Sequence, residues 1–534
     1  MRTWLSLALA LTVLRAFACG GEPTVVDAGK FIDRSLGDCG IQRAIDSLPK
    51  EGGVVELPEG RFPLERYLFL KSGTTLRGKG PKTILAAGKP EPRRNVTKDA
   101  PAKSTELVVE GDLAGLKPGM LAFAWRFRVP GWMGYIKPYR VKEVRGQTIV
   151  FAEPLQCEML VRNQAQVSWG FVTPLAAPAR KGEKAIQVEH PELLPPGTGI
   201  TFGGDGDLWN HHFNAVVAAQ GNTLSLERPI GVNAAAGTHV HHAYSAITAD
   251  GQENVAIESL RIEGWPGDEK PVKRDFYFSA IHIVRTNNIV VRNVEVQDWQ
   301  ADGVSIQAGK NCLVEHCLAT RNCGHGFHSG TDFTDGLWVN LRSLANGADG
   351  FYYCWHDKNV VVRNCVLSEN RGHGVGGLGN PGDRQCTVEG NTIERNGKAG
   401  VEVNGGMVSK SVIRNNVVRD NSREKPGRWP GIALFASAED ARAYTVEGNT
   451  VESTLPEPTQ WVGIEERCGD PPLREVERDG KRAVETRIAD ENVIRGNKLA
   501  GHKTADIVLV GERTACEGNG AARVVRKAPG QAKQ

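Results

Sequence analysis

Residues 280–431 repeat one dipeptide, a Gly followed by an apolar residue: Gly303-Val304, Gly326-Phe327, Gly350-Phe351, Gly374-Val375, Gly400-Val401 and Gly431-Ile432. The steps between these glycines are 23, 24, 24, 26 and 31 residues. Two further markers share the period: Asn293, Asn340, Asn364 and Asn391, with His316 in one turn, and Asn322, Asn346, Asn370, Asn396 and Asn421. Three markers with one period indicate a repeat architecture.

Short β-rich runs lie between the markers, for example residues 359–363 and 386–389, and they end in Gly, Asn or Asp. No window of helical length has a 3.6-residue period, which excludes a helical solenoid. Turns of two or three short strands stack into parallel sheets, and inward Asn side chains can form ladders that satisfy the buried turn backbone. This pattern resembles the right-handed parallel β-helix of the pectate-lyase-like superfamily, over the N-terminal segment and residues 246–465.

The sequence therefore predicts an all-β fold, a right-handed parallel β-helix (a pectin-lyase-like solenoid) with an N-terminal capping helix and an inserted small β region. Asp38 caps the predicted helix, which has Ile41, Ala44 and Ile45 on its apolar face. The predicted domains are a signal peptide at 1–18, the cap and first coils at 24–89, inserted duplicated β modules at 90–245, the β-helix at 246–515 and a disordered tail at 516–534.

The N-terminus predicts a secreted or periplasmic protein. Arg2 supplies the charge, residues 5–14 the apolar core and Ala16-Phe17-Ala18 the cleavage site of a signal peptide. Attachment as a lipoprotein through Cys19 is the less favoured alternative, because a lipobox has Leu or a similar residue where Ala16 stands. The apolar core is too short to span a membrane, and no later stretch qualifies.

Composition narrows the function classes. The net charge of +3 does not suggest nucleic-acid binding, and a monomer is expected. Of 11 cysteines, six lie between Cys312 and Cys386, inside the repeat, and we interpret them as buried free thiols because they do not share one column. No Cys-x-x-Cys pair is present, so no cysteine zinc site is predicted.

The insertion contains an internal duplication. Gly119 and Gly146 in its first half match Gly197 and Gly221 in its second, at offsets of 78 and 75 residues. The first half has a long loop at residues 125–140, where aromatic rings with cationic neighbours suit sugar stacking, and Trp125 and Trp132 are the candidates for substrate binding. The second half ends near His239 and His241, which lack a recognisable third ligand, so no metal site is predicted.

Alignment of the turns on the marker Gly produces two columns of reactive residues. The position before the Gly contains Ser279, Asp302, His325, Asp349 and His373, and the outward position after the apolar residue contains His282, Ser305, His328, Tyr352, Gly376 and Glu402. We expect the first column to edge the exposed sheet, because unpaired charges are rarely buried.

These columns hold the candidate catalytic residues. Asp302 and Asp349 are two coils apart, about 9.6 Å at an inter-strand spacing of about 4.8 Å. That distance is at the upper edge of the roughly 6.5–9.5 Å that separates the carboxyl groups of inverting glycosidases. The further catalytic candidates are His325, His328, His373 and Glu402. The candidates for substrate binding are His282, Tyr352, Trp355 and His356.

Two of the corner motifs, Asp-Gly and Gly-His-Gly, are similar to those of polygalacturonase-type glycoside hydrolases: Ala301-Asp302-Gly303, Gly324-His325-Gly326, Ala348-Asp349-Gly350 and Gly372-His373-Gly374. The family's paired Asp-Asp and downstream Arg-Ile-Lys are not found at matching positions. A lyase would instead use His328, Tyr352 or His356 as base or acid and a cation such as Lys358. Asp332 and Asp357 are weak candidates for calcium, and no other cofactor is expected.

Isolated Asp-Gly dipeptides are common turn residues, but five of the 13 histidines lie in consecutive coils here. We therefore predict a secreted enzyme that cleaves a polysaccharide, uronate-containing or otherwise acidic, with hydrolysis ahead of β-elimination. An epimerase on the same scaffold and a non-catalytic carbohydrate-binding or adhesion β-helix remain the alternatives.

Overall fold

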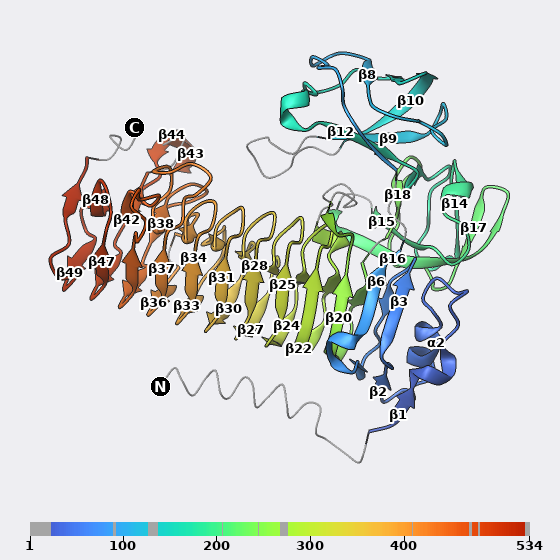
Figure 1. Ribbon diagram of the computed structural model, residues 1–534, viewed down its shortest axis with the longest axis horizontal. Helices are drawn as coiled ribbons and strands as arrows, with labels where there is room; N and C mark the ends of the chain where they lie inside the picture. The colour runs from blue at the N-terminus through green and yellow to red at the C-terminus, as the bar shows by residue number, and fades with distance from the viewer. Residues whose placement is uncertain are drawn as a thin grey trace.

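The computed structural model describes residues 23–88, 92–125, 137–204, 207–243, 245–267, 276–407, 409–468, 473–478 and 481–528. The predicted signal peptide, Cys19 and Trp132 lie outside the described residues. The chain winds into a long parallel β-coil, and two small sheets stand at its N-terminal end (Figure 1).

One face of the coil is a twelve-stranded parallel sheet. Its strands are short because each occupies one side of one turn, and their apolar side chains point inward. In β29, for example, Phe351 and Tyr353 are buried and Tyr352 points outward. The strands in spatial order are β4 (Leu68–Phe69), β19 (Ile247–Asp250), β21 (Ile281–Val284), β23 (Val304–Gln307), β26 (Phe327–Ser329), β29 (Phe351–Tyr353), β32 (Val375–Leu378), β35 (Val401–Val403), β38 (Ile432–Phe435), β42 (Val462–Arg467), β48 (Ala505–Leu509) and β50 (Val524–Arg526).

The other faces form one 22-stranded sheet, since the long strands β20 (Glu253–Glu263) and β22 (Asn287–Gln297) continue around a corner. Its remaining strands are β1 (Val25–Asp27), β2 (Gly53–Glu56), β3 (Gly60–Leu64), β5 (Thr74–Arg77), β6 (Thr83–Ala87), β24 (Lys310–Glu315), β25 (Leu318–Thr320), β27 (Thr334–Val339), β28 (Arg342–Leu344), β30 (Lys358–Arg363), β31 (Val366–Ser368), β33 (Thr387–Glu389), β34 (Thr392–Glu394), β36 (Val412–Arg414), β37 (Val417–Arg419), β40 (Thr445–Glu447), β41 (Thr450–Glu452), β46 (Val493–Arg495), β47 (Lys498–Ala500) and β49 (Ala515–Glu517).

A buried amide ladder runs along the coil, as the repeat predicts. Its members are Asn322, Asn346, Asn370, Asn396 and Asn421, and each Nδ2 donates to the Oδ1 of the next at 2.9–3.0 Å. Gln460 ends the ladder, accepting from Asn421 at 2.8 Å. Each rung also accepts a backbone N–H, so the ladder pairs turn groups that burial would otherwise leave unsatisfied.

The second Asn marker was partly misplaced. Arg363 pairs with Glu389, so Gly390 and not Asn391 stands opposite Asn364. Asn391 lies one residue further, points inward and begins a second ladder. This ladder contains Asn391, Asn416, Asn449, Asn497 and Asn519.

The N-terminal end of the coil is covered by helix α2 (Ile41–Asp46), which confirms the predicted cap (Figure 1). The Oδ1 of Asp38 accepts from the backbone N–H of Gly40 at 2.7 Å, just before the helix. Ile41, Ala44 and Ile45 are fully buried. Short 3-10 turns lie at Ala28–Phe31, Gly80–Lys82, Val161–Asn163, Pro191–Leu193 and Phe276–Phe278.

The insertion forms two six-stranded antiparallel sheets with the same strand order, 1-6-3-4-5-2 along each half. The first contains β7 (Arg93–Asn95), β12 (Gln166–Trp169), β9 (Leu121–Trp125), β10 (Lys137–Arg145), β11 (Thr148–Phe151) and β8 (Glu106–Val108), and the second contains β13 (Val172–Pro174), β18 (His239–His242), β15 (Gly199–Gly204), β16 (Asp207–Gln220), β17 (Thr223–Leu226) and β14 (Ala185–Gln187). Beneath them the coil is continuous, because β6 pairs directly with β20.

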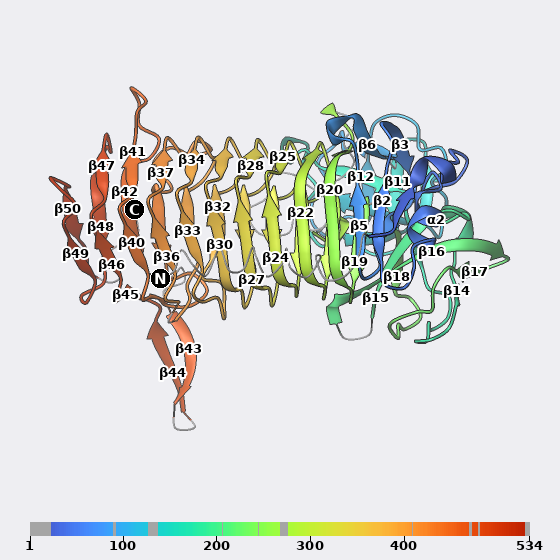
Figure 2. The ribbon, with the colours of Figure 1, turned by 90° about the horizontal axis from the view of Figure 1, so that it is seen from below.

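The C-terminal part differs from the prediction of a disordered tail at 516–534. Strands β49 and β50 continue the two sheets of the coil as far as Arg526, so that prediction is wrong for residues 516–526. Strands β43 (Leu473–Arg478) and β44 (Lys481–Thr486) pair as a hairpin that projects from the coil (Figure 2). Strands β39 (Ala441–Arg442) and β45 (Ala489–Asp490) form a small parallel pair.

Two general predictions can be compared with the described part of the chain. Five cysteines inside the repeat are buried free thiols, as predicted: Cys312, Cys317, Cys354, Cys365 and Cys386. None of the helices in the described part has the length and apolar character needed to cross a membrane.

Candidate active site

The predicted outward column is confirmed on the twelve-stranded sheet. Strand pairing places His282, Ser305, His328, Tyr352 and Gly376 side by side on consecutive coils. A bulge then follows, because Val375 pairs with Val401 but Leu378 pairs with Val403, and Glu402 comes next in the column. The chain thus lines one coil face with imidazole, phenol and carboxylate groups.

The corner column is more buried than we expected. Asp302 is 3% and Asp349 8% exposed. Each carboxylate caps the following coil, since the Oδ1 of Asp302 accepts from the backbone N–H of His325 at 2.7 Å, and the Oδ1 of Asp349 accepts from that of His373. We expected an exposed edge because burial of an unpaired carboxylate is unfavourable. These hydrogen bonds offset that cost, so the carboxylates can be buried. The second oxygen of each carboxylate faces an imidazole.

Asp302 and His328 form a buried ion pair. The Nδ1 of His328 lies 2.8 Å from the Oδ2 of Asp302, and both side chains are 5% exposed. Burial favours the neutral form of Asp302, but the neighbouring His325 and His328 lower its pKa to about 2. Burial likewise favours neutral His328, but the bond to Asp302 raises its pKa to about 9. At neutral pH the pair is therefore carboxylate and imidazolium.

His325 connects the next carboxylate to a phenol. Its ring stacks on that of Tyr352, with centroids 4.5 Å apart and an angle of 18°. Its Nδ1 accepts the backbone N–H of Asp349 at 3.1 Å and lies 3.4 Å from the Oδ2 of that residue. With Nδ1 as the acceptor, the ring carries its proton on Nε2.

The corner also contains a cation that the sequence did not identify. Burial raises the pKa of Asp349, but His325, His373 and Lys398 outweigh it and lower that pKa. Lys398 is half-buried and lies two residues before the marker Gly400. This fixed spacing from the marker Gly could have identified Lys398 from the sequence. The equivalent positions in earlier coils hold only Ala or Gly, so the position did not look reactive.

Tyr352 lies close to two carboxylates. Burial raises its pKa, and Cys354, Asp349 and Glu402 raise it further, so the phenol stays protonated at neutral pH. Its hydroxyl accepts from the Nδ2 of Asn380 at 3.2 Å. The half-buried Glu402 accepts the backbone N–H of Gly377 at 3.0 Å.

Glycine leaves room for these groups. A Cβ on Gly376 would lie 2.5 Å from the Oδ2 of Asp349, and one on Gly377 would lie 2.7 Å from the Tyr352 ring. The carboxylate and the ring therefore lie directly over this strand, which any larger residue would prevent.

Three of the predicted substrate-binding residues differ widely from one another in solvent exposure. His282 is 2% exposed because Phe213 of the insertion and Phe276 pack on it, at 5.4 and 6.1 Å between ring centroids. Burial lowers its pKa to about 3, so it is neutral and covered rather than a binding group. Trp125 is 2% exposed in the first inserted sheet, so its predicted sugar contact is wrong. Trp355, in contrast, is 51% exposed.

The two weak calcium candidates do not form one site. Asp332 is exposed and pairs with His356 at 3.0 Å, whereas Asp357 is fully buried and accepts from the hydroxyl of Ser329. Within the described ranges no group of three or more His, Cys, Asp or Glu side chains could hold a metal ion.

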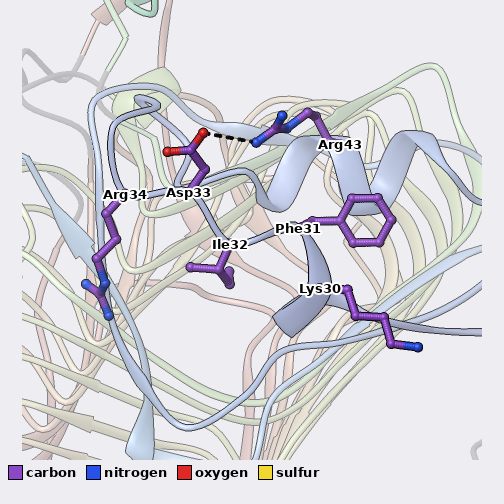
Figure 3. Close-up of a pocket in the computed structure, with 6 residues that line it drawn as sticks. All are labelled: Lys30, Phe31, Ile32, Asp33, Arg34 and Arg43. Carbon is purple, nitrogen blue, oxygen red and sulfur yellow. Dashed lines mark hydrogen bonds and ion pairs between the residues drawn. The ribbon is translucent and has the colours of Figure 1, made fainter.

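A separate hollow of about 660 Å³ lies at the N-terminal cap (Figure 3). Its lining residues are Lys30, Phe31, Ile32, Asp33, Arg34 and Arg43. Arg43 pairs with Asp33 at 3.4 Å, and both side chains are exposed. None of the predicted reactive residues lines this hollow.

Comparison with known proteins agrees with the coil. Residues 231–379 and 279–451 match the family model described as a right handed beta helix region. No curated protein matches the chain. Among solved structures, the chain is similar to the A-module of the mannuronan C-5 epimerase AlgE6 from Azotobacter vinelandii, with 15% identity, a TM-score of 0.48 and coverage of 94% of this chain and 100% of that one.

Two further similarities are more distant. The polygalacturonase from Erwinia carotovora ssp. carotovora has 13% identity and a TM-score of 0.41, with 95% of this chain and 98% of that one covered. The tailspike protein gp49 from Pseudomonas phage LKA1 has 12% identity and a TM-score of 0.38, with 90% and 72% covered. These likenesses concern the fold alone. Together with the parallel strand pairing, the family match shows that the chain is a right-handed parallel β-helix protein.

Proposed function

We propose that this protein is an enzyme that acts on an acidic, uronate-containing polysaccharide by removing the proton next to the uronate carboxylate. The result is β-elimination or C5 epimerisation. The observation that carries the proposal is the position of Tyr352, which stacks on His325 and lies close to the carboxylates of Asp349 and Glu402.

Proton abstraction at this carbon needs a base, a proton donor and positive charge near the carboxylate. In the proposal the half-buried Glu402 is the base. The Nε2–H of His325 and the ammonium of Lys398 offset the charge that develops on the uronate carboxylate. Tyr352 keeps its proton because burial raises its pKa. It can therefore donate that proton to the glycosidic oxygen as the bond breaks, or to the opposite face of the sugar carbon.

Hydrolysis, which the sequence placed first, becomes the second candidate. An inverting hydrolase needs one carboxylic acid that stays protonated at working pH. The pKa values of Asp302 and Asp349 are lowered, so both are carboxylates. Asp357 and Asp383 have raised pKa values, but they are 0% and 3% exposed inside the coil. A polymer cannot reach them.

A panel of uronate polymers and neutral glucans, incubated with the full chain, tests the proposal. Elimination produces unsaturated ends that absorb in the ultraviolet, and epimerisation changes the ratio of C5 isomers in proton NMR spectra without shortening the polymer. New reducing ends without absorbance would favour hydrolysis. Binding without any product would support the non-catalytic alternative and overturn the proposal.

A matched pair of variants identifies the acid. Tyr352→Phe removes the outward hydroxyl, and we expect it to slow the reaction by about 10²–10⁴-fold. Tyr353→Phe removes the hydroxyl of the next residue, which faces inward and contacts backbone carbonyls of the coil. This control should keep its rate within about twofold, since that hydroxyl cannot meet a substrate.

The predicted signal peptide supports a secreted or periplasmic location, where such polymers occur. The monomeric state and the identity of the polymer stay predictions of the sequence.

A further inference from the structure

Cys354 lies beside the proposed catalytic groups. It directly follows β29, in which Tyr352 points outward, and alternate residues of a strand face the same side. Its backbone N–H donates to the carbonyl of Ser329 at 2.9 Å, which places it next to strand β26 and therefore near His328. The side chain is 5% exposed, and the Oγ1 of Thr331 lies 3.2 Å from its sulfur.

His328 has one nitrogen without a hydrogen-bond partner. Its Nδ1 bonds to Asp302, whereas its buried Nε2 meets no partner of hydrogen-bond geometry among the described residues. An unsatisfied buried polar atom costs roughly 1–3 kcal/mol. The neighbour besides Asp302 that raises the pKa of His328 is the sulfur of Cys354. Strand pairing agrees, because Tyr352 is the partner of His328 and Cys354 lies two residues after it on the same side.

We propose that Cys354 is a positioning residue of the candidate active site: its sulfur bonds the Nε2 of His328 and completes an Asp302–His328–Cys354 chain next to the ring of Tyr352. The thiol gives its proton to the Nε2, and the resulting thiolate accepts the hydrogen bond from the imidazolium. No oxidation or covalent step is involved.

The charges around Cys354 favour this arrangement. Burial disfavours the thiolate, but His328 outweighs burial and lowers the pKa of Cys354. On the other side lie Asp357, which accepts the backbone N–H of Cys354 at 3.3 Å, and its neighbour Asp383. Burial raises the pKa of both carboxyls, the charge of Asp383 raises that of Asp357 further, and Cys354 raises both, so at neutral pH they are protonated and carry no charge against a thiolate.

The consequence concerns Tyr352. The ring of His328 meets that of Tyr352 edge-on, with centroids 5.1 Å apart. A thiolate at Cys354 is the largest influence after burial that raises the pKa of Tyr352. Cys354 thus helps to keep the phenol protonated, which the proposed acid role requires. This effect on turnover rests on the proposed function, but the chemistry of the thiol does not.

Cys365 provides an internal control. It is also buried in the coil, but its sulfur donates to the carbonyl of Arg363 at 3.1 Å, and burial raises its pKa to about 12. It has the same residue type and a similar burial, without an imidazole partner.

Alkylation of the full-length protein by iodoacetamide, followed residue by residue with mass spectrometry, tests the thiol at a series of pH values. We expect the rate at Cys354 to reach its plateau at lower pH than an ordinary thiol of pKa about 8.5. In His328→Gln that plateau should move to higher pH, while Cys365 stays slow in both proteins. An ordinary profile for Cys354, or one that His328→Gln leaves unchanged, overturns the inference.

A second measurement does not require His328→Gln to fold. The thiolate absorbs in the ultraviolet, so the difference in absorbance between the wild type and Cys354→Ser at neutral pH should show one thiolate, and the absence of this difference refutes the inference. In the activity assay, Cys354→Ala should move the basic limb of the kcat profile to lower pH. If no polymer is turned over but the thiol titrates as expected, the proposed function fails and the Asp302–His328–Cys354 chain stands.

Discussion

The buried ion pair of Asp302 and His328 should make the stability of the coil depend on alkaline pH. A His whose pKa is raised by folding stabilises the protein fully below its unfolded value, and this contribution is lost as the pH rises through the folded value. For His328 these values are 6.5 and about 9. The difference corresponds to roughly 3 kcal/mol at 1.36 kcal/mol per pKa unit.

The same interaction seen from Asp302 gives a similar magnitude. Its pKa falls from 3.8 to about 2, which corresponds to roughly 2 kcal/mol. This contribution is present above the unfolded value and is lost as the pH falls through the folded one. Both figures describe one pair and are not added, so removal of the pair should cost about 2–3 kcal/mol.

Denaturant unfolding between pH 6 and pH 10 measures the effect, with His328→Gln as the reference that cannot titrate. In a Cys354→Ser background, where no thiol can share its proton with the imidazole, the protein with His328 should lose up to about 3 kcal/mol more than the His328→Gln variant between about pH 6.5 and 9.5. Local exchange of the His325 amide, which donates to Asp302, should accelerate in parallel. Equal losses in the two proteins would falsify the assignment of His328 as a buried cation.

Three further outcomes are expected. Asn370→Leu leaves several groups of the ladder unpaired and should lower the free energy of unfolding by about 3–6 kcal/mol in a denaturant titration, so a loss below 1 kcal/mol would contradict the ladder's role. Gly376→Ala should push Asp349 aside and slow turnover at least about tenfold while the melting temperature changes little, and unchanged turnover would argue against Asp349. Trp355→Ala removes an exposed ring and should raise KM for polymers more than it lowers kcat, whereas identical kinetics would place the substrate elsewhere.

The fold could be predicted because every turn of the coil needs the same residue types at the same positions. Each coil needs an apolar residue after the corner Gly and an amide that reaches the next coil, so the same residues recur at the same spacing. The error at Asn391 has the same origin. A turn can place either Gly390 or Asn391 at the tight position, and only the strand pairing of Glu389 shows that Gly390 occupies it.

The candidate site was predicted in part. The outward column with His328 and Tyr352 follows from alternation along the strand, and strand pairing confirms it. The burial of Asp302 does not follow from the period, because it depends on whether a carboxylate reaches the next coil's backbone. The covering of His282 depends on Phe213, which is far away in the chain. Sequence spacing contains no information on such a contact.

Lys398 and Cys354 were missed for different reasons. Lys398 stands in a column that holds Ala or Gly in earlier coils. No charged residue recurs at that position, so the repeat did not indicate a cation there. Cys354 looked like the other thiols of the coil, and its difference is a neighbour on the adjacent strand. A single imidazole partner separates a packing thiol from a reactive one.

The direct pairing of β6 with β20 has a consequence for how β-helix proteins can gain or exchange inserted domains. Residues 84 and 261 are partners in adjacent strands although two complete sheets interrupt the chain between them. For a flexible connection, each doubling of length costs only about 0.6 kcal/mol. The corner after β6 is therefore a grafting point, where one accessory unit can be exchanged for another while every later coil, and the chemistry on it, keeps its place.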